Sequence, residues 1–358
     1  MKIAILGDTH FGMRNDSAVF NELARKFYTE VFFPYLDEHQ IMNVIQLGDL
    51  FDRRKFINFN ILSSAKEYFF GPLADRHIGL WTLLGNHDIF YRNTLAVNST
   101  SLVLGEYTKH TIMVIDKPTT LDWGDIKFDL IPWICEENEK EVAEFIKNSK
   151  SDLCFGHFEL AGFEMDRGNF CHEGMDMGIL SKYEQVISGH FHHKSSKGNI
   201  LYTGVPYQMT WADWNDPKGF HVLDTETREI EFIQNPHEIY VKIGYNDDNL
   251  FFDEVQNGDY SAFTGKYVKV VVEKKSNSFL FETLIESLNK ANPIDVTIVE
   301  DFTDISLIDA NGDGVIDQAD DTLSIIDKVV EGMEIDLQKP RLKSILREVY
   351  NEALASES

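Results

Sequence analysis

The sequence predicts an α/β fold in which two sheets lie between outer helices, followed by a small α+β domain. Short apolar runs alternate with helix-length amphipathic stretches, and each apolar run ends in a polar cluster. The chain has 358 residues, with 26 Phe and 13 Tyr, which is enough apolar surface for at least two folding units. No apolar stretch is long enough to span a membrane and no signal peptide is evident, so we expect a soluble, cytoplasmic protein without a membrane partner.

The first domain is expected over residues 1–235. Its apolar runs have the composition of strands covered on both faces, and they lie at 2–6, 43–47, 80–84, 152–155 and 185–188. Amphipathic stretches at 17–34 and 59–70 separate the first three runs and give a β-α-β order. Later strands predict a second sheet, and hence a helix-sheet-sheet-helix sandwich; they lie near 111–115, 126–134, 200–203, 219–224 and 229–233.

The pattern changes after Asn235-Pro236. Strands near 239–245, 266–273 and 294–299, with a helix near 279–291, predict a small α+β domain over residues 236–300. Residues 301–358 are expected to form an acidic linker and C-terminal helices, the last of which follows Pro340 and has an apolar stripe at helical spacing.

The charge of the chain bears on its substrate. Lys plus Arg total 33 and Asp plus Glu total 59, so the formal net charge is −26. This balance argues against nucleic acid, because phosphate backbones are normally met by an excess of basic residues. Bound cations, a local basic patch or a basic partner would have to compensate.

Five polar clusters follow five of the predicted strands. They read Gly7-Asp8-Thr9-His10, Gly48-Asp49-Leu50-Phe51-Asp52, Gly85-Asn86-His87-Asp88, Gly156-His157 and Gly189-His190-Phe191-His192. Since the carboxyl ends of strands are where sites form in open α/β sheets, we expect these clusters to converge. The glycine at the start of each cluster would allow a sharp turn and a close approach of the backbone.

The clusters contain ligands for divalent metals. Asp, Asn and His together suit manganese, iron or zinc, and two ions roughly 3.5 to 4 Å apart can share one carboxylate. Asp49 is our candidate for that shared ligand. Two such ions would activate a water and neutralise charge on phosphoryl oxygens, so the pattern predicts phosphate ester hydrolysis. Any one cluster alone could be an ordinary loop cap.

The five clusters, in this order, resemble the motifs of the calcineurin-like metallophosphoesterases. The segments GDLFD, GNHD and GHFH, the last followed by Tyr202-Thr203-Gly204-Val205-Pro206, are most similar to SbcD-type nucleases, which work with an SMC-like coiled-coil ABC ATPase. The length and the acidic C-terminal part resemble the phage-encoded form. This resemblance implies a four-layer α-β-β-α metallophosphoesterase sandwich, with the small α+β domain as a cap.

The resemblance also implies roles for single residues. Asp8, His10, Asp49 and His192 would hold one metal, and Asp49, Asn86, His157 and His190 would hold the other. Manganese is the first candidate for both ions, with magnesium, iron and zinc as alternatives. His87 would stay unligated and act as the catalytic acid, and Asp88 would fix the ring or the loop.

The implied activity is that of a manganese-dependent DNA exonuclease and endonuclease in recombination and repair. The resemblance further implies a homodimer that binds the ATPase through its C-terminal helices, in the bacterial host cytoplasm if the protein is phage-encoded.

A metallophosphatase for small phosphomonoesters or phosphoproteins is the alternative, and it suits the net charge of −26 better. A non-catalytic scaffold is a third hypothesis, but scaffolds of this kind usually lack several ligands and this chain lacks none.

Basic and aromatic residues near the motifs leave two interpretations each. Arg53, Arg54 and Lys55 could grip a DNA backbone or form a solvated loop. Trp211 and Trp214 could stack on bases, but we favour packing at a domain seam.

Two other features have less direct interpretations. Some relatives have a histidine in place of Asp52, and His193 is expected to face solvent or to support a ligand. A calcium-loop pattern occurs in the acidic segment at Asp309, Asn311, Asp313, Asp317 and Asp320, with Asp320 in place of the usual Glu. An acidic linker is the alternative for this segment.

Overall fold

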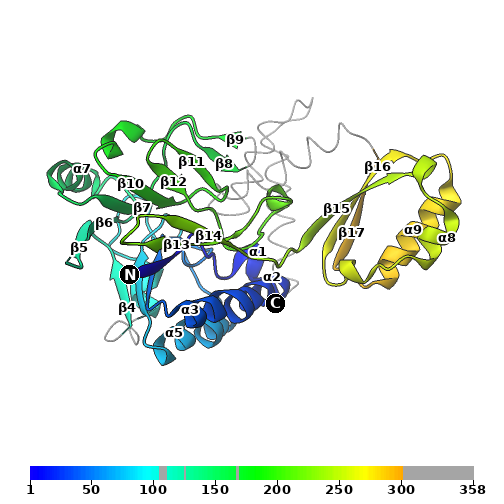
Figure 1. Cartoon of the computed structure of the whole chain (residues 1–358), viewed down its shortest axis with the longest axis horizontal. Coiled ribbons are helices and arrows are strands. Elements are labelled where there is room, and N and C mark those ends of the chain that lie inside the picture. The colour runs from blue at the N-terminus through cyan, green and yellow to red at the C-terminus, as the bar shows by residue number, and fades with distance from the viewer. Residues whose placement is uncertain (105–110, 125, 167–168, 301–358) are drawn as a thin grey trace, which may run out of the picture.

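The protein consists of a two-sheet body and a small domain to one side of it (Figure 1). A computed structural model describes residues 1–104, 111–124, 126–166 and 169–300. The predicted calcium loop at 309–320 and the predicted C-terminal helices lie outside the described residues.

The first sheet has six strands in the order β14-β13-β1-β2-β3-β4. Four of them are parallel: β1 (Lys2–Leu6), β2 (Asn43–Gln46), β3 (Gly79–Leu83) and β4 (Ile112–Ile115). The strands β13 (Gly219–Asp224) and β14 (Ile230–Gln234) add an antiparallel edge beside β1.

The second sheet also has six strands, in the order β11-β12-β10-β7-β6-β5. Its parallel centre consists of β6 (Lys127–Ile131), β7 (Leu153–His157), β10 (Gln185–Gly189) and β12 (Ile200–Tyr202). Antiparallel strands close both edges, namely β5 (Thr119–Asp122) and β11 (Ser195–Lys197).

Helices cover the outer face of each sheet. Two interrupted helices cover the first sheet: α2 (Ala18–Lys26) continues through η1 (Phe27–Phe32) into α3 (Phe33–His39), and α4 (Phe59–Ala65) continues through η2 (Lys66–Phe70) into α5 (Gly71–Asp75). The second sheet is covered by α7 (Glu139–Asn148). Shorter elements complete the body: α1 (Met13–Asp16), α6 (Ser99–Val103), β8 (Glu164–Asp166), β9 (Asn169–Phe170), η3 (Met177–Leu180) and η4 (Trp211–Asp213).

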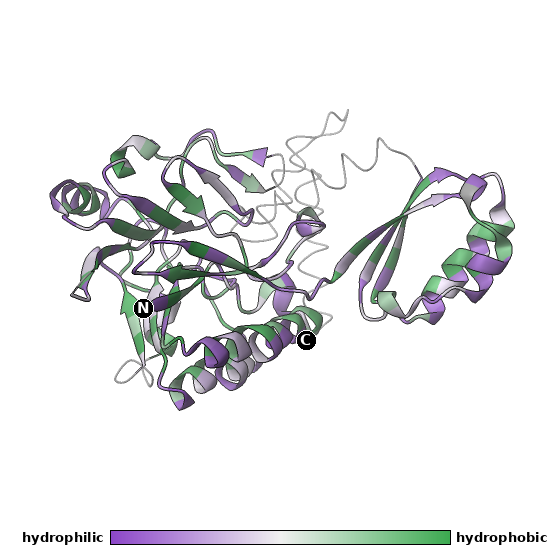
Figure 2. Ribbon diagram, viewed as in Figure 1, coloured by the Kyte–Doolittle hydropathy of each residue, from purple (hydrophilic) through white to green (hydrophobic). Residues whose placement is uncertain are grey.

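Side-chain alternation along the strands builds three core layers. In β1, Ile3 and Ile5 belong to a core shared with Phe128 and Phe155 of the second sheet. Ala4 and the other alternate residues instead pack with the helices that cover the first sheet. Because both faces of each sheet are covered at its centre, the central strands are mostly apolar, and hydrophobic residues concentrate in them (Figure 2).

The small domain has a parallel sheet with helices on one side. Its strands β15 (Tyr240–Asn246), β16 (Tyr267–Lys274) and β17 (Asp295–Val299) share a core with α8 (Phe252–Asn257) and α9 (Ser278–Lys290). Two short helical turns connect these elements, η5 (Asp247–Asn249) and η6 (Ser261–Phe263). The rings of Tyr240 and Tyr267 lie 6.1 and 5.9 Å from that of Phe20, so the base of this domain packs on α2.

The observed architecture is an α/β fold with mixed sheets. The strand positions agree with the predicted ones to within a few residues, but their assignment to sheets needs correction. The runs at 152–155 and 185–188 lie in the second sheet, whereas those at 111–115, 219–224 and 229–233 complete the first. Sheet membership follows from pairing between distant strands, which apolar periodicity does not specify. Among the described residues, no helix has both the length and the apolar character needed to cross a bilayer.

Candidate metal centre

The five polar clusters meet at strand ends from both sheets. The clusters containing Asp8, Asp49 and Asn86 follow β1, β2 and β3 of the first sheet, and those with His157 and His190 lie at the ends of β7 and β10 of the second. Within each sheet these strands are parallel, so their carboxyl ends share one edge. The expected convergence is therefore present, and it joins two sheets.

Asp8, His10 and His192 form the first cluster. One ligand atom from each lies within 4.8 Å of the other two. The Nε2 atoms of His10 and His192 are 3.1 Å apart, and Nε2 of His192 is 3.9 Å from Oδ2 of Asp8. Asp8 and His10 are buried, while the side chain of His192 is 18% exposed. The first cluster is therefore a candidate metal site that solvent can reach from the His192 side.

Asp49, His157 and His190 form the second cluster, and their ligand atoms also lie within 4.8 Å of one another. Oδ1 of Asn86 is 3.0 Å from Nε2 of His157 and 3.0 Å from Nδ1 of His190. All four predicted ligands of this site are thus brought together.

The carboxylate of Asp49 lies between the two clusters. Its Oδ2 is 3.4 Å from Nε2 of His157 and 3.9 Å from Nε2 of His10. Its Oδ1 accepts a hydrogen bond from the main-chain N–H of His87 at 2.7 Å. One side chain therefore faces both candidate sites.

The donor atoms of the second cluster fit a cation. Nδ1 of His157 is 2.7 Å from the carbonyl oxygen of Leu47, an atom that can only accept, so this ring nitrogen carries a proton. In the neutral imidazole Nε2 is then a lone-pair donor, and it faces the oxygens of Asn86 and Asp49. When His157 is neutral, its ring nitrogen and the two oxygens converge without a proton between them, which is the arrangement that a divalent metal ligates.

The electrostatics of the two clusters also favour bound positive charge. Burial raises the pKa of Asp8 to about 7, with His157 opposing the rise and Asp49 adding to it. Burial opposes charging of His157, yet Asp49 and Asp8 raise the pKa of its imidazole to about 9. Burial and the neighbouring His157 lower the pKa of His190 to about 3. The carboxylates of Asp8 and Asp49 thus favour positive charge nearby, whether it is a proton on His157 or a bound cation.

Three of the ligands have strained backbones. His10, Asp49 and His190 have φ angles of 43°, 52° and 87°, in a region that residues with a Cβ seldom occupy. The main-chain N–H of His190 donates to both carboxylate oxygens of Asp8 at 3.0 Å, which helps to hold this conformation. Backbone strain of this kind is typical of functional sites.

Glycines allow the loops to approach one another. Gly48 has a φ of 105°, and a Cβ there would lie 2.5 Å from Nδ1 of His157. A Cβ on Gly189 would lie 2.5 Å from Oδ1 of Asp8. The expected close approach is present at both positions, and at Gly48 the turn itself also favours glycine.

His87 and Asp88 lie beside the ligands. The ring of His87 is 4.9 Å from that of His10, and its Nδ1 donates to the carbonyl oxygen of Asp52 at 2.6 Å, which leaves Nε2 as the other exchangeable nitrogen. Asp88 is fully buried and accepts from the main-chain N–H groups of Gly85 at 2.8 Å and Leu50 at 3.0 Å. Asp88 thus ties the second and third motif loops together.

Asp52 and His193 contact the ligand loops. Oδ1 of Asp52 is 3.4 Å from Nδ1 of His10. Burial opposes charging of His10, but Asp52 and Asp49 raise the pKa of this imidazole to about 10. Nδ1 of His193 is 3.1 Å from Asp216 and its Nε2 is 3.2 Å from Glu164, so His193 pairs with acids beside the first cluster. The sequence indicated no partner for either residue.

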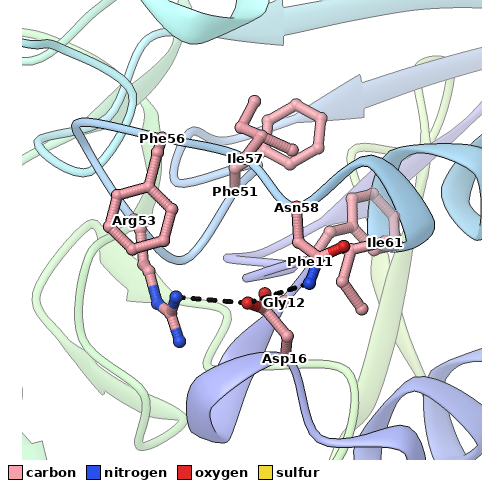
Figure 3. A pocket seen from close by; sticks show the side chains of 9 residues that line it. All are labelled: Phe11, Gly12, Asp16, Phe51, Arg53, Phe56, Ile57, Asn58 and Ile61. Atoms are coloured by element: carbon pink, nitrogen blue, oxygen red, sulfur yellow. Dashed lines mark hydrogen bonds and ion pairs between the residues drawn. The ribbon is translucent and has the colours of Figure 1, made fainter. Parts of the chain in front are cut away.

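Arg53 is held against α1, the short helix that follows the first motif (Figure 3). Its guanidinium is 3.1 Å from Oδ2 of Asp16 and donates to Asn15 at 2.9 Å, and it lies over the ring of Phe56. Lys55 is exposed, and Arg54 is partly buried. Arg53 is therefore part of a structured contact and not of a simple solvated loop, and it follows Asp52, whose carboxylate lies 3.4 Å from His10.

A buried polar residue beneath the site was not predicted from the sequence. Gln46 donates to the carbonyl oxygens of Gly7 and Gly48, and its Oε1 accepts from the hydroxyl of Thr82 at 2.6 Å. Gln46 thereby joins the first two motif loops. A glutamine inside the otherwise apolar run NVIQL was the available signal.

The tryptophans after the last motif pack at the domain seam, as favoured from the sequence. The ring of Trp211 is 4.6 Å from that of Tyr240 and lies below the ammonium of Lys269. Trp214 lies below the ammonium of Lys242. Both rings therefore face the small domain.

Comparison with known proteins agrees with this geometry. Residues 1–194 match the family described as calcineurin-like phosphoesterase. The chain is 38% identical over 306 residues to Exonuclease subunit 1 of Enterobacteria phage T4, covering 84% of this chain and 87% of that protein. It is 24% identical over 313 residues to a subunit of the nuclease SbcCD from Staphylococcus epidermidis, covering 79% and 78%.

Proposed function

The chain belongs to the calcineurin-like phosphoesterase family, and on this premise we propose that it is a two-metal nuclease that hydrolyses phosphodiester bonds in DNA. The position of Asp49 carries the proposal, because its carboxylate faces two separate clusters of metal-binding side chains. The names of the relatives, an exonuclease subunit and a nuclease subunit, supply the substrate class. The fold is then the four-layer sandwich of this family, with the small domain over residues 236–300 as its cap.

We assign the ligands by cluster. The first ion would be held by Asp8, His10, Asp49 and His192. The second would be held by Asp49, Asn86, His157 and His190. Manganese is the proposed metal, since mixed carboxylate, amide and imidazole ligands suit borderline divalent ions, and magnesium, iron and zinc are the alternatives to be compared.

When bound, two such ions supply a water nucleophile activated near neutral pH and positive charge for the phosphoryl oxygens. The residues of the chain have complementary tasks. His87, with Nδ1 fixed by the carbonyl of Asp52, presents Nε2 for protonating the leaving oxygen. Asp88 keeps the His87 loop in register with the Asp49 loop through its three main-chain hydrogen bonds.

The basic residues after the second motif are the proposed contacts to DNA. Arg53 is oriented by Asp16 and Asn15, and Lys55 is exposed beside it. Arg54 completes this short basic segment. Phosphate contacts of this type position a duplex without reading its sequence. They place positive charge locally on a chain whose net charge is −26.

The names of the two relatives also bear on assembly. Both proteins are named as subunits, one of an exonuclease and the other of the nuclease SbcCD, which supports a complex for this chain as well. We propose an SMC-like coiled-coil ATPase as the partner, a homodimer as the assembly, and residues 301–358 as the docking segment. Recombination and repair of DNA ends is the corresponding process.

The decisive experiment compares two substrates with one preparation. A labelled DNA duplex and an aryl phosphate are incubated side by side with Mn²⁺, and the Asp49→Asn chain, purified in parallel, controls for contaminating hydrolases. We expect Mn²⁺-dependent cleavage of the duplex by the unmodified chain alone. Turnover of the aryl phosphate without cleavage of DNA would instead favour the metallophosphatase, and no turnover of either would favour a scaffold.

A further inference from the structure

A buried lysine lies behind the first cluster. Lys218 immediately precedes β13 and is 5% exposed. Its ammonium donates to the carbonyl oxygen of His192 at 2.9 Å and to Asp216 at 2.7 Å, and it contacts Asp213 at 2.6 Å. All three N–H groups of the side chain are therefore used, and one of them is directed at the main chain of a proposed metal ligand.

The two aspartates keep this ammonium charged. Burial opposes the charged form, but Asp213 and Asp216 raise the pKa of Lys218 above its usual value. Asp213 is itself fixed, because its Oδ2 accepts from the main-chain N–H groups of Met209 at 2.8 Å and Thr210 at 2.9 Å. The lysine is thus anchored to a rigid turn on one side and to the His192 loop on the other.

Lys218 could neutralise Asp213 and Asp216 without its third hydrogen bond, the one to the carbonyl oxygen of His192. The contact with His192 fixes the backbone of a residue whose imidazole lies 3.1 Å from that of His10. The main-chain N–H of His192 also donates, to the carbonyl oxygen of Met165 at 3.2 Å. Since both peptide groups of His192 are held, the positions open to its imidazole are restricted to the few rotamers of one fixed backbone.

We propose that Lys218 is a positioning residue, which holds His192 through its carbonyl group so that the imidazole can bind the first metal ion. This inference rests on the proposed two-metal function. It assigns Lys218 to the first metal site, because its contact is with the carbonyl group of His192. In the second cluster, His157 is oriented by the carbonyl oxygen of Leu47, and the main-chain N–H of His190 is held by Asp8.

The test measures binding of Mn²⁺ by calorimetry, with the full chain. Two backgrounds isolate the sites: His157→Ala disables the second cluster, and His10→Ala disables the first. Adding Lys218→Met to the His157→Ala chain should weaken the remaining site by about ten- to a hundredfold, the usual effect of losing a group that supports a ligand. Adding it to the His10→Ala chain should leave the remaining affinity unchanged.

A second variant tests whether the chain still folds, since Lys218→Met removes the ammonium that neutralises two largely buried carboxylates. The double variant Lys218→Met with Asp216→Asn has the same net charge as the original group of three residues, and its circular dichroism establishes that it is folded. Lys182→Met is the matched control, because Lys182 also donates to main-chain carbonyls, those of Ile146 and Ser149, but away from the metal centre.

The outcomes separate the two proposals. Equal weakening of both sites, or of neither, in the folded Lys218 variants would overturn the positioning role. Weakening by Lys182→Met to the same extent would do so as well. If the unmodified chain fails to bind two Mn²⁺ ions, the proposed two-metal function fails first, irrespective of Lys218.

Discussion

The two clusters of the metal centre differ in how their histidines are oriented. In the second cluster, His157 donates from Nδ1 to the carbonyl oxygen of Leu47, a main-chain group at the end of β2. In the first cluster, Nδ1 of His10 lies 3.4 Å from the side chain of Asp52, and the loop of His192 is held by the side chain of Lys218. His157 of the second cluster is therefore oriented by a main-chain group, whereas His10 and the His192 loop of the first are supported in part by side chains that substitution can remove.

This difference predicts unequal tolerance to mutation. A main-chain acceptor persists whatever residue occupies position 47, so orientation of His157 depends only on the strand. Orientation of His10 and His192 depends on one carboxylate and one ammonium, each replaceable by a single substitution. Substitution of either support should thus weaken the first site and leave the second nearly unchanged.

The largest expected effect comes from the residue that the clusters share. Asp49→Asn removes negative charge from both sites at once, so occupancy of both should fall and hydrolysis should drop by about a thousandfold or more, the scale of losing several kcal/mol of charge stabilisation. Calorimetry with Mn²⁺ and a duplex cleavage assay measure the two quantities. Loss of one site with full retention of the other would show that Asp49 is not shared.

His87→Ala should have the next largest effect on hydrolysis, and it should leave metal binding by both clusters intact. The ring donates to the carbonyl of Asp52 and is not among the converging ligand atoms, so metal affinity should remain nearly unchanged. Hydrolysis should fall by about a hundredfold or more, the usual contribution of a general acid. His39→Ala, which removes an exposed histidine of α3, is the control. Parallel loss of metal and activity in His87→Ala would remove the proposed role of this residue.

Asp52→Asn is expected to distinguish the clusters most cleanly. The amide retains the shape of the carboxylate but lacks the charge beside Nδ1 that makes Nε2 of His10 a stronger metal ligand. The Mn²⁺ affinity of the first site should therefore fall by about tenfold to a hundredfold. The second site should be unaffected because His157 is oriented by Leu47. Asp16→Asn, in the neighbouring Arg53 contact, is the matched control. Calorimetric titration of each chain reports both sites, and weakening of the second site would contradict the distinction.

The same contrast explains what could be predicted from the sequence. The strands that carry the ligands were evident because a doubly covered parallel strand is an apolar run, and the glycine and ligand residues follow each run directly. His157 is supported by the main-chain carbonyl of Leu47 at the end of β2, so this support requires only that the strand forms. Convergence of the five clusters could therefore be expected from local patterns alone.

The supports of the first cluster could not be predicted in this way. Lys218 meets His192 across 26 residues, and Asp52 meets His10 from another strand end. Such contacts depend on how the loops fold in three dimensions, and a single lysine or aspartate in a polar segment has no distinguishing local pattern. The helix α7 was not predicted either, although Val142, Phe145 and Ile146 lie at helical spacing in its sequence EKEVAEFIKN and pack on the second sheet.

The smallest expected effect lies outside both clusters, at Lys55. This exposed side chain is proposed to contact a phosphate, so Lys55→Ala should weaken duplex binding by a few-fold for all sequences and reduce the slope of log affinity against log salt by about 1. Metal affinity and turnover of bound substrate should not change, because neither cluster is touched.

Duplex binding by Lys55→Ala is measured at several salt concentrations, with Ca²⁺ in place of Mn²⁺ to prevent cleavage. Lys140→Ala, on α7, supplies the matched control of equal charge. An unchanged salt slope in Lys55→Ala would place DNA elsewhere, and would leave the difference between the two metal clusters intact.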